Sequence, residues 1–167
     1  ADSLSLSGEI VSSTAIKSLI RSGEMREAYR ALGRPHAIYG TVVAGQKLGR
    51  RLGYPTANVQ REDVDQLLPP DGVYACDLEL LRPMGCSEQH HAMLYIGKRP
   101  TLGGELERTI EVHILDFDEM IYGMEVIVHI FEQLHPEHRF ASTEELRSAL
   151  ETYEQDTRHY FAENIRY

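Results

Sequence analysis

Two side chains with neutral oxygens, Thr56 and Asn58, lie two positions apart in the tetrapeptide Pro55-Thr56-Ala57-Asn58. If this stretch is extended, the hydroxyl and the amide oxygen point to the same side. Pro55 favours an extended conformation in the residue before it. Such oxygens are hard ligands that suit a Mg²⁺ ion shared with nucleotide phosphates. A simple Asn/Thr turn is the alternative that the spacing leaves open.

Glycine and positive charge surround this tetrapeptide. Residues 28–61 contain six Lys or Arg and no Asp or Glu, although the 167-residue chain has a net charge of -9. Glycines let backbone N–H groups approach phosphate oxygens, which basic side chains neutralise. The segment therefore indicates a small polyanion such as a nucleotide, while the acidic whole disfavours a long nucleic acid. A solvated basic loop is the alternative.

The glycine-rich segment matches neither of two familiar phosphate-binding patterns. No Gly-Lys-Ser/Thr follows at the spacing of a Walker loop, and no helical pattern follows as in a dinucleotide fingerprint.

Glu111 is the candidate general base. It lies beside His113 on the polar side of a strand pattern whose other side is apolar. A carboxylate on a rigid strand could accept a proton from an attacking hydroxyl. A solvent-facing Glu remains the alternative. The eight histidines include no His-Glu-x-x-His spacing, so we expect them to be structural or to line a substrate site.

Hydrophobic periodicity places these residues in a mainly β protein. Alternating patterns predict strands over residues 36–43, 73–81, 91–96, 109–115 and 124–131. No helical pattern separates them, which favours an antiparallel sheet over parallel units. Five or six such strands closed on themselves make a small barrel.

Helical patterns occur near both ends of the chain. Two short helices are predicted before Pro35, with stops at Gly23 and Gly33. A capping box at residues 142–145 begins a closing helix. Residues 1–11 are polar and Ser-rich, and we expect them to be poorly ordered.

Composition excludes several classes of protein. The longest strongly apolar stretch, about residues 124–131, is far shorter than the ~20 residues of a membrane helix. Two cysteines, Cys76 and Cys86, cannot build a disulfide framework or a cysteine zinc site. We expect a cytoplasmic protein with no membrane or nucleic-acid partner, and we also expect it to be a monomer that acts on small molecules.

Several motifs, in a fixed order, resemble those of riboflavin kinases, and Pro-Thr-Ala-Asn in its glycine-rich context is the most specific of them. The matches span about residues 32–161. They are Gly40–Gly45, Gly49-Arg50, Leu52–Asn58, Gly72–Ala75, Ile96–Thr101, Glu111–Leu115, Phe117–Gly123 and Phe140–Leu146.

The resemblance implies a fold and a reaction. The fold would be a six-stranded antiparallel Greek-key barrel with a C-terminal helix and short N-terminal helices. The enzyme would use Mg²⁺ with ATP to convert riboflavin into FMN, releasing ADP. A non-catalytic flavin- or nucleotide-binding barrel module is the alternative, and a regulatory domain is a third class.

The resemblance also implies roles for individual residues. Thr56 and Asn58 would coordinate Mg²⁺, and Glu111 would orient and deprotonate the ribityl 5′-hydroxyl. Nucleotide-binding residues, partly in a loop that closes over the phosphates, would be Gly45, Lys47, Gly49, Arg50, Pro55 and Thr56. Flavin-binding residues would be Glu111, His135, His138 and Phe140.

One position departs from the family's pattern. Where the family usually has a Leu/Ile-Arg pair before the closing helix, this chain has Leu134-His135. A histidine can donate a hydrogen bond, but its charge depends on pH. We therefore expect the change to affect flavin affinity more than catalysis.

The front of the chain resembles the junction of bifunctional riboflavin kinase/FAD synthetases. Val11–Lys17 matches the last motif of their adenylyltransferase domain, with Lys17 in place of an Arg, and Leu32–Pro35 matches the joint. The His-x-Gly-His motif of that domain is absent. We expect residues 1–35 to be a remnant or linker of it and residues 36–167 to be the kinase domain. A FAD synthetase domain could accompany the kinase in a longer chain.

Overall fold

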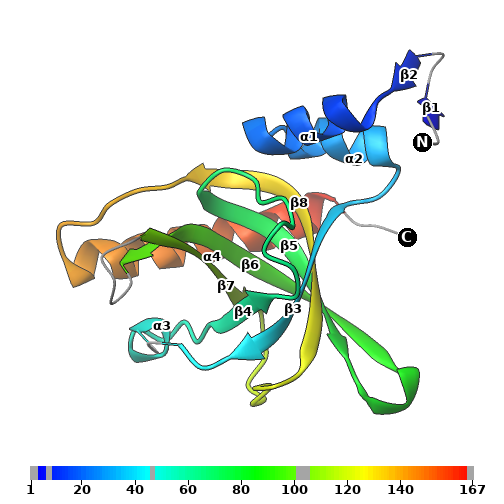
Figure 1. Ribbon diagram of the computed structural model, residues 1–167. Helices are drawn as coiled ribbons and strands as arrows, with labels where there is room; N and C mark the ends of the chain where they lie inside the picture. Colours follow the sequence, from blue (N-terminus) through cyan, green and yellow to red (C-terminus); the bar gives the residue numbers. More distant parts are fainter. Residues whose placement is uncertain (1–3, 7–8, 46–47, 101–105, 165–167) are drawn as a thin grey trace.

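The computed structural model describes residues 4–6, 9–45, 48–100 and 106–164. Within these residues, six strands close into an antiparallel barrel (Figure 1). The strands, in barrel order, are β3 (His36–Val43), β4 (Ala57–Arg61), β7 (Leu106–Ile114), β6 (Ser87–Pro100), β5 (Gly72–Leu81) and β8 (Glu125–Pro136).

The connectivity of this barrel is a Greek key. β5, β6 and β7 follow one another as antiparallel neighbours, and β8 returns to pair with β5. That order, with the fourth strand beside the first, defines the motif. The predicted barrel topology is therefore confirmed.

Apolar side chains that alternate along each strand fill the barrel. On β5, for example, Tyr74, Cys76, Leu78 and Leu80 are all fully buried, as the alternating pattern predicted. Every second residue of a strand points to the same side, so the intervening residues face outward. Burying one large aliphatic side chain contributes about 1.5–3 kcal/mol, and this shared interior holds the strands in register.

β6 and β8 extend well beyond their predicted ranges. β8 continues to Pro136, and its pairing with β5 shifts register twice, between Val73 and Tyr74 and between Ala75 and Cys76. Such irregularities interrupt the two-residue period. β6 begins at Ser87 and ends at Pro100, and its N-terminal end is polar and largely exposed. Hydrophobic alternation could not predict this end of β6, because it has no buried face.

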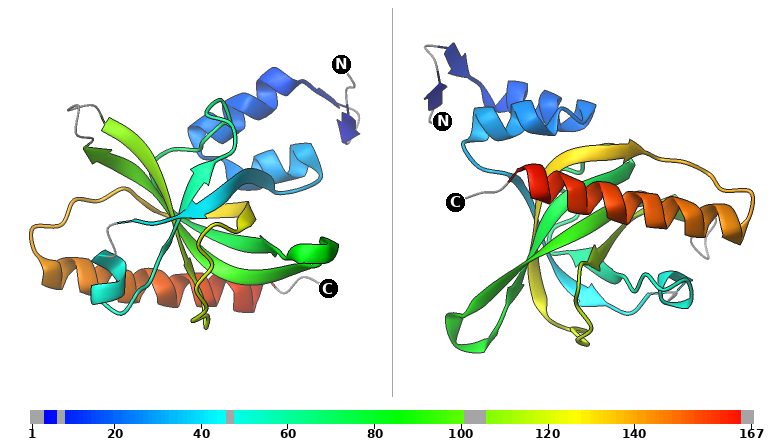
Figure 2. Two further views of the ribbon diagram at one scale, coloured as in Figure 1. Left: turned by 60° about the horizontal axis from the view of Figure 1, so that its bottom comes forward. Right: turned by 180° about the vertical axis from the view of Figure 1, so that it is seen from behind.

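Helices cover the outside of the barrel. α4 (Thr143–Glu163) crosses it in front of the strands when the molecule is seen from behind (Figure 2, right). Its residue Tyr160 packs with Ala75 and Phe131 in a second apolar cluster. The Ser142 hydroxyl accepts from the Glu145 N–H at 3.2 Å, which confirms the predicted cap.

The N-terminal helices lie beside one end of the barrel (Figures 1 and 2). α1 (Ser13–Ser22) and α2 (Met25–Leu32) end at Gly23 and Gly33, as predicted, and both glycines are left-handed. None of the helices in the described part of the chain is long and apolar enough to span a bilayer.

The expectation for residues 1–11 is wrong in part. β1 (Leu4–Leu6) pairs antiparallel with β2 (Glu9–Val11). Leu-Ser-Leu is an alternating strand pattern, and the prediction gave too much weight to the serine content around it.

Candidate active site

Thr56, Asn58 and Glu111 lie together where β4 meets β7. Asn58 is directly opposite Glu111 in the ladder, and residues paired in this way share a face of the sheet. The Thr56 hydroxyl donates to the Glu111 carboxylate, with Oγ1 and Oε2 3.4 Å apart. The fold therefore brings the three candidate residues to one place, although Glu111 comes from a strand more than fifty residues away.

Gly45 makes room for the Asn58 side chain. A Cβ atom at position 45 would overlap the Asn58 amide group. The backbone at Gly45 therefore packs directly against one of the two candidate metal ligands.

Gly49 allows the chain before Thr56 to fold back on itself. The Tyr54 N–H donates to the Gly49 carbonyl at 2.8 Å, and a Cβ at position 49 would overlap the Tyr54 carbonyl oxygen. The short helix α3 (Leu48–Arg51) begins this turn. The turn delivers Pro55 and Thr56 to the end of β4.

Two cavities share Thr56 as a lining residue. The smaller, of about 60 Å³, is also lined by Arg50, Pro55 and Tyr122. The larger, of about 300 Å³, is also lined by Gly49 and Glu111. A group bound in one cavity could therefore meet a group bound in the other beside Thr56.

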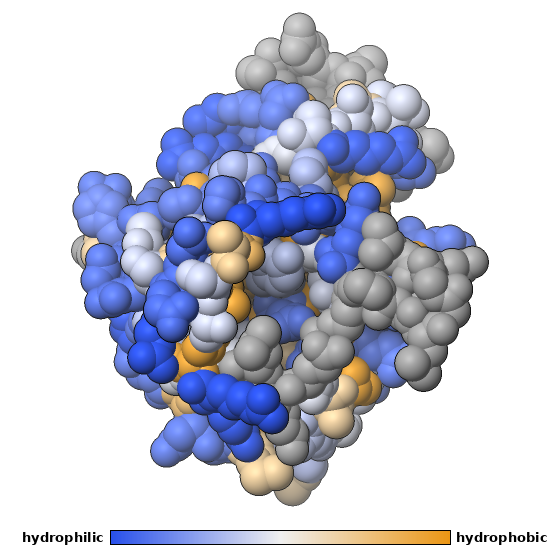
Figure 3. Space-filling model, turned by 90° about the vertical axis from the view of Figure 1, so that its left-hand side faces the viewer, coloured by the Kyte–Doolittle hydropathy of each residue, from blue (hydrophilic) through white to orange (hydrophobic). Residues whose placement is uncertain are grey.

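Aromatic and aliphatic side chains make up most of the larger cavity's wall. Its remaining residues are Leu52, Tyr54, Val73, Met93, Tyr95, His113, His138, Phe140, Leu146, Leu150 and Tyr153. Rings and apolar side chains with a few polar groups suit a flat aromatic ligand. Figure 3 views the side of the molecule on which α3 lies, where the surface is hollowed and hydrophobic residues border the hollow.

Burial is the main cause that raises the pKa of three phenols in this cavity, those of Tyr54, Tyr95 and Tyr153. Negative charges raise the pKa of Tyr95 further, among them Glu137 and Glu111. These hydroxyls can therefore donate hydrogen bonds to a ligand at neutral pH.

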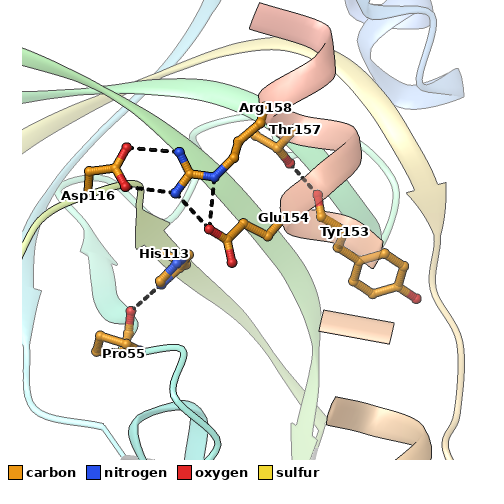
Figure 4. Close-up of polar contacts among 7 residues, drawn as sticks. All are labelled: Pro55, His113, Asp116, Tyr153, Glu154, Thr157 and Arg158. Carbon is orange, nitrogen blue, oxygen red and sulfur yellow. Dashed lines mark hydrogen bonds and ion pairs between the residues drawn. The ribbon is translucent and has the colours of Figure 1, made fainter. Parts of the chain in front are cut away.

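α4 forms one wall of the larger cavity and is tied to the end of β7. Arg158 donates to both carboxylate oxygens of Asp116 at 2.8 Å, and also to Glu154 (Figure 4). The hydrogen bond from Arg158 is the main cause that lowers the pKa of Asp116. The ion pair joins the helix that carries Tyr153 to the turn that follows the strand of Glu111.

The predicted ligand residues fall in different places. Arg50, Pro55 and Thr56 line the smaller cavity, whereas His138 and Phe140 line the larger one, with their rings 5.0 Å apart. Lys47 lies outside the described residues.

His135 faces α4. Its Nε2 is 2.7 Å from the Asp156 carboxylate, and its ring centroid is 4.4 Å from that of Tyr153. It is absent from the described lining of the larger cavity, whereas Tyr153, which it contacts, is part of that lining.

Sequence reasoning did not include His113 among the site residues, although it lies two positions after Glu111. It lines the larger cavity, is 8% exposed, and its Nδ1 is 2.8 Å from the Pro55 carbonyl oxygen. The i, i+2 spacing on one strand face was the available signal. The sequence could not reveal the contact with Pro55.

The neutral donors at this site fit a metal that arrives with its own anionic ligands. In the described ranges, no group of three His, Cys, Asp or Glu side chains could hold an ion. Thr56 and Asn58 offer oxygens without charge, which suit Mg²⁺ when phosphates supply the remaining ligands.

The sequence model of the Flavokinase family, described as riboflavin kinase, matches residues 32–161. This chain therefore belongs to the riboflavin kinase family. That range begins at the end of α2 and includes the whole barrel and most of α4.

Curated relatives carry a second activity in their names. The chain is 40% identical over 161 residues to the bifunctional riboflavin kinase/FMN adenylyltransferase of Listeria monocytogenes, covering 96% of this chain and 49% of the relative. It is 36% identical over 155 residues to the Escherichia coli protein of the same name, covering 92% and 47%. This chain thus spans about half the length of the relatives it matches.

Two solved structures share the fold. A Streptococcus pneumoniae protein titled macrolide-efflux protein aligns with a TM-score of 0.80 and 36% identity, over 93% of this chain and 49% of that one. Riboflavin kinase from Trypanosoma brucei aligns with a TM-score of 0.58 and 22% identity, over 78% and 79%. At that identity, the second likeness concerns the fold alone.

Proposed function

We propose that this chain transfers the γ-phosphoryl group of ATP to the 5′-hydroxyl of riboflavin, producing FMN and ADP. The observation that carries the proposal is the position of Thr56, which lines both cavities and lies 3.4 Å from Glu111. Phosphoryl transfer requires the attacking hydroxyl of one substrate to lie in line with the leaving oxygen of the other, at a place where charge on the phosphoryl group is stabilised. Family membership supports the same reaction.

The smaller cavity is the proposed phosphate side. Arg50 supplies positive charge there, and Gly45 leaves backbone close to Asn58. Gly49, which is also proposed for the nucleotide, lines the larger cavity together with Thr56. Thr56 and Asn58 would hold Mg²⁺, which would neutralise charge on the transferring phosphate. Lys47 is still proposed to bind the nucleotide, because it belongs to the basic segment of residues 28–61.

The larger cavity is the proposed flavin side. His138, Phe140 and Tyr153 offer rings to the isoalloxazine, and Glu111 lies where the cavity reaches Thr56. Glu111 would hold the 5′-hydroxyl in line and accept its proton during transfer. His135 would act on flavin binding through its contacts with Asp156 and Tyr153.

We further infer that residues 1–35 belong to the end of an adenylyltransferase part and its linker, and that residues 36–167 form the kinase. The relatives' names include FMN adenylyltransferase, and this chain spans about half their length. We assign the FAD-forming step to the part of such proteins that this chain does not match. A monomeric state, a cytoplasmic location and the lack of a nucleic-acid partner stay predictions.

The test is chromatographic detection of FMN after purified chain is mixed with riboflavin and Mg·ATP. We expect FMN and ADP in equal amounts, and none with a non-hydrolysable ATP analogue. Flavin binding without conversion under these conditions would instead support the non-catalytic module. FAD among the products would contradict the assignment of that step to another part.

A further inference from the structure

His113 contacts the two residues that precede Thr56. It lies on β7, two residues beyond Glu111, with its Nδ1 2.8 Å from the Pro55 carbonyl oxygen (Figure 4). Its ring also meets the edge of Tyr54, with centroids 5.5 Å apart. A carbonyl oxygen only accepts, so Nδ1 must carry the hydrogen in this bond. The imidazole therefore holds two consecutive residues, Tyr54 and Pro55.

The residue after this pair is Thr56. Proline has no N–H, so Pro55 can be fixed by hydrogen bonding only through its carbonyl group. The carbonyl belongs to the same peptide unit as the Thr56 nitrogen, and that unit is planar. Fixing the oxygen of this unit therefore fixes the direction in which the chain enters Thr56.

We propose that His113 is a positioning residue that sets the Thr56 hydroxyl against Glu111 by holding the Pro55 carbonyl. The proposal rests on the phosphoryl transfer proposed above. It assigns His113 no proton transfer in the reaction: Glu111, which contacts Thr56, is the proposed proton acceptor, and Nδ1 of His113 bonds to backbone. His113, a wall residue of the larger cavity, thus also orients Thr56, which both cavities share.

Two substitutions separate this role from simple packing. His113→Leu fills space but removes the donor. His113→Asn keeps an amide N–H near the position of Nδ1–H. A misplacement of about 1 Å can cost ~10²-fold in rate, so we expect kcat to fall about 10- to 100-fold in His113→Leu. We expect His113→Asn to stay within about fivefold of the native chain. The KM for riboflavin should change less than kcat in both variants.

His36 offers a matched control. Its Nε2 is 2.7 Å from the Leu67 carbonyl oxygen, so it makes the same kind of ring-to-backbone bond. It lines neither of the cavities that share Thr56. His36→Leu should therefore lower stability and leave kcat unchanged, which separates the loss of a part-buried histidine bond from the loss of positioning.

Amide hydrogen exchange at Thr56, Ala57 and Asn58 gives a readout that does not depend on catalysis. We expect faster exchange at these amides in His113→Leu than in the native chain, and native rates in His113→Asn. Equal exchange and equal kcat in the native chain and His113→Leu would overturn the proposal. If His113→Leu does not fold, a loss of kcat of more than about tenfold in His113→Asn would overturn it as well.

The pH profile tests for a direct chemical role. The profile of kcat should keep its shape in His113→Asn, because the proposal gives His113 no proton to transfer. If the acidic or the basic limb of the kcat profile disappeared in His113→Asn, the positioning role would be overturned. A native chain that forms no FMN would instead refute the proposed function, and the exchange measurement would still decide whether His113 positions Thr56.

Discussion

Asn58 of β4 lies directly across from Glu111 of β7 in the antiparallel ladder. An amide oxygen and a carboxylate thus project from the same face of the barrel, while their neighbours Ala57 and Val112 form the next pair. Adjacent residues of a strand point to opposite faces. Val112 is fully buried in the core, so packing of the interior fixes the positions of the polar pair outside.

The first prediction concerns the metal. Thr56 and Asn58 bring no charge, so we expect FMN formation to require Mg²⁺ or a similar hard divalent cation. Excess chelator should abolish FMN formation, and added Mg²⁺ should restore it, as measured by product chromatography. Activity that survives exhaustive chelation would show that the site works without a metal.

The second prediction concerns Gly45. In Gly45→Ala the added Cβ would overlap the Asn58 amide, so Asn58 would have to turn away from Glu111. We expect kcat to fall at least about tenfold and the Mg²⁺ concentration for half-maximal rate to rise, as measured by steady-state kinetics.

Gly33→Ala is the control for this substitution. Gly33 has no atom within 4 Å of an added Cβ, but its φ of +69° is left-handed. This variant should therefore lose about 1 kcal/mol of stability and keep its kcat. If Gly45→Ala had the kcat and the Mg²⁺ dependence of the native chain, Asn58 would have no role in the reaction.

The third prediction concerns pH and His36. Burial is the main cause that lowers the pKa of His36, and the bond to the Leu67 carbonyl partly opposes it. The folded protein therefore favours neutral His36, and its contribution to stability is complete above the ordinary histidine pKa of about 6.5. That contribution should decline as the pH falls below this value.

His36→Gln tests the pH effect, because Gln stays neutral and can donate to the same carbonyl. The free energy of unfolding in urea should fall less between pH 7.5 and pH 5.5 in this variant than in the native chain. An equal fall in both would assign the acid sensitivity to other groups.

Much of the barrel could be predicted from the sequence, because its interior is built from residues of period two. Ile110, Val112 and Ile114 are buried, as the alternating pattern required. The end of β8 could not be predicted, since its register shifts break that period. Alternation reports a strand only where one face is buried and the ladder is regular.

The candidate site could be predicted in part. Thr56, Asn58 and Glu111 were chosen by residue type and family resemblance, and the ladder brings them together. The walls of the larger cavity depend on distant segments, such as Tyr95 of β6 and Tyr153 of α4. No local sequence pattern identifies such residues, because they share only their proximity in the folded structure. His135 was chosen from the family pattern alone, and its contact with Asp156 was not indicated by the sequence.

The central claim is that Glu111 activates the riboflavin hydroxyl beside Thr56. Its most direct test is the kcat for FMN formation in Glu111→Gln, with Glu107→Gln, an exposed residue of the same strand, as the control. A positioned base typically contributes ~10²–10⁴-fold. We expect a loss of that size in Glu111→Gln, with riboflavin and Mg·ADP dissociation constants within about threefold of native, and no loss in the control. A native kcat in Glu111→Gln would contradict the account.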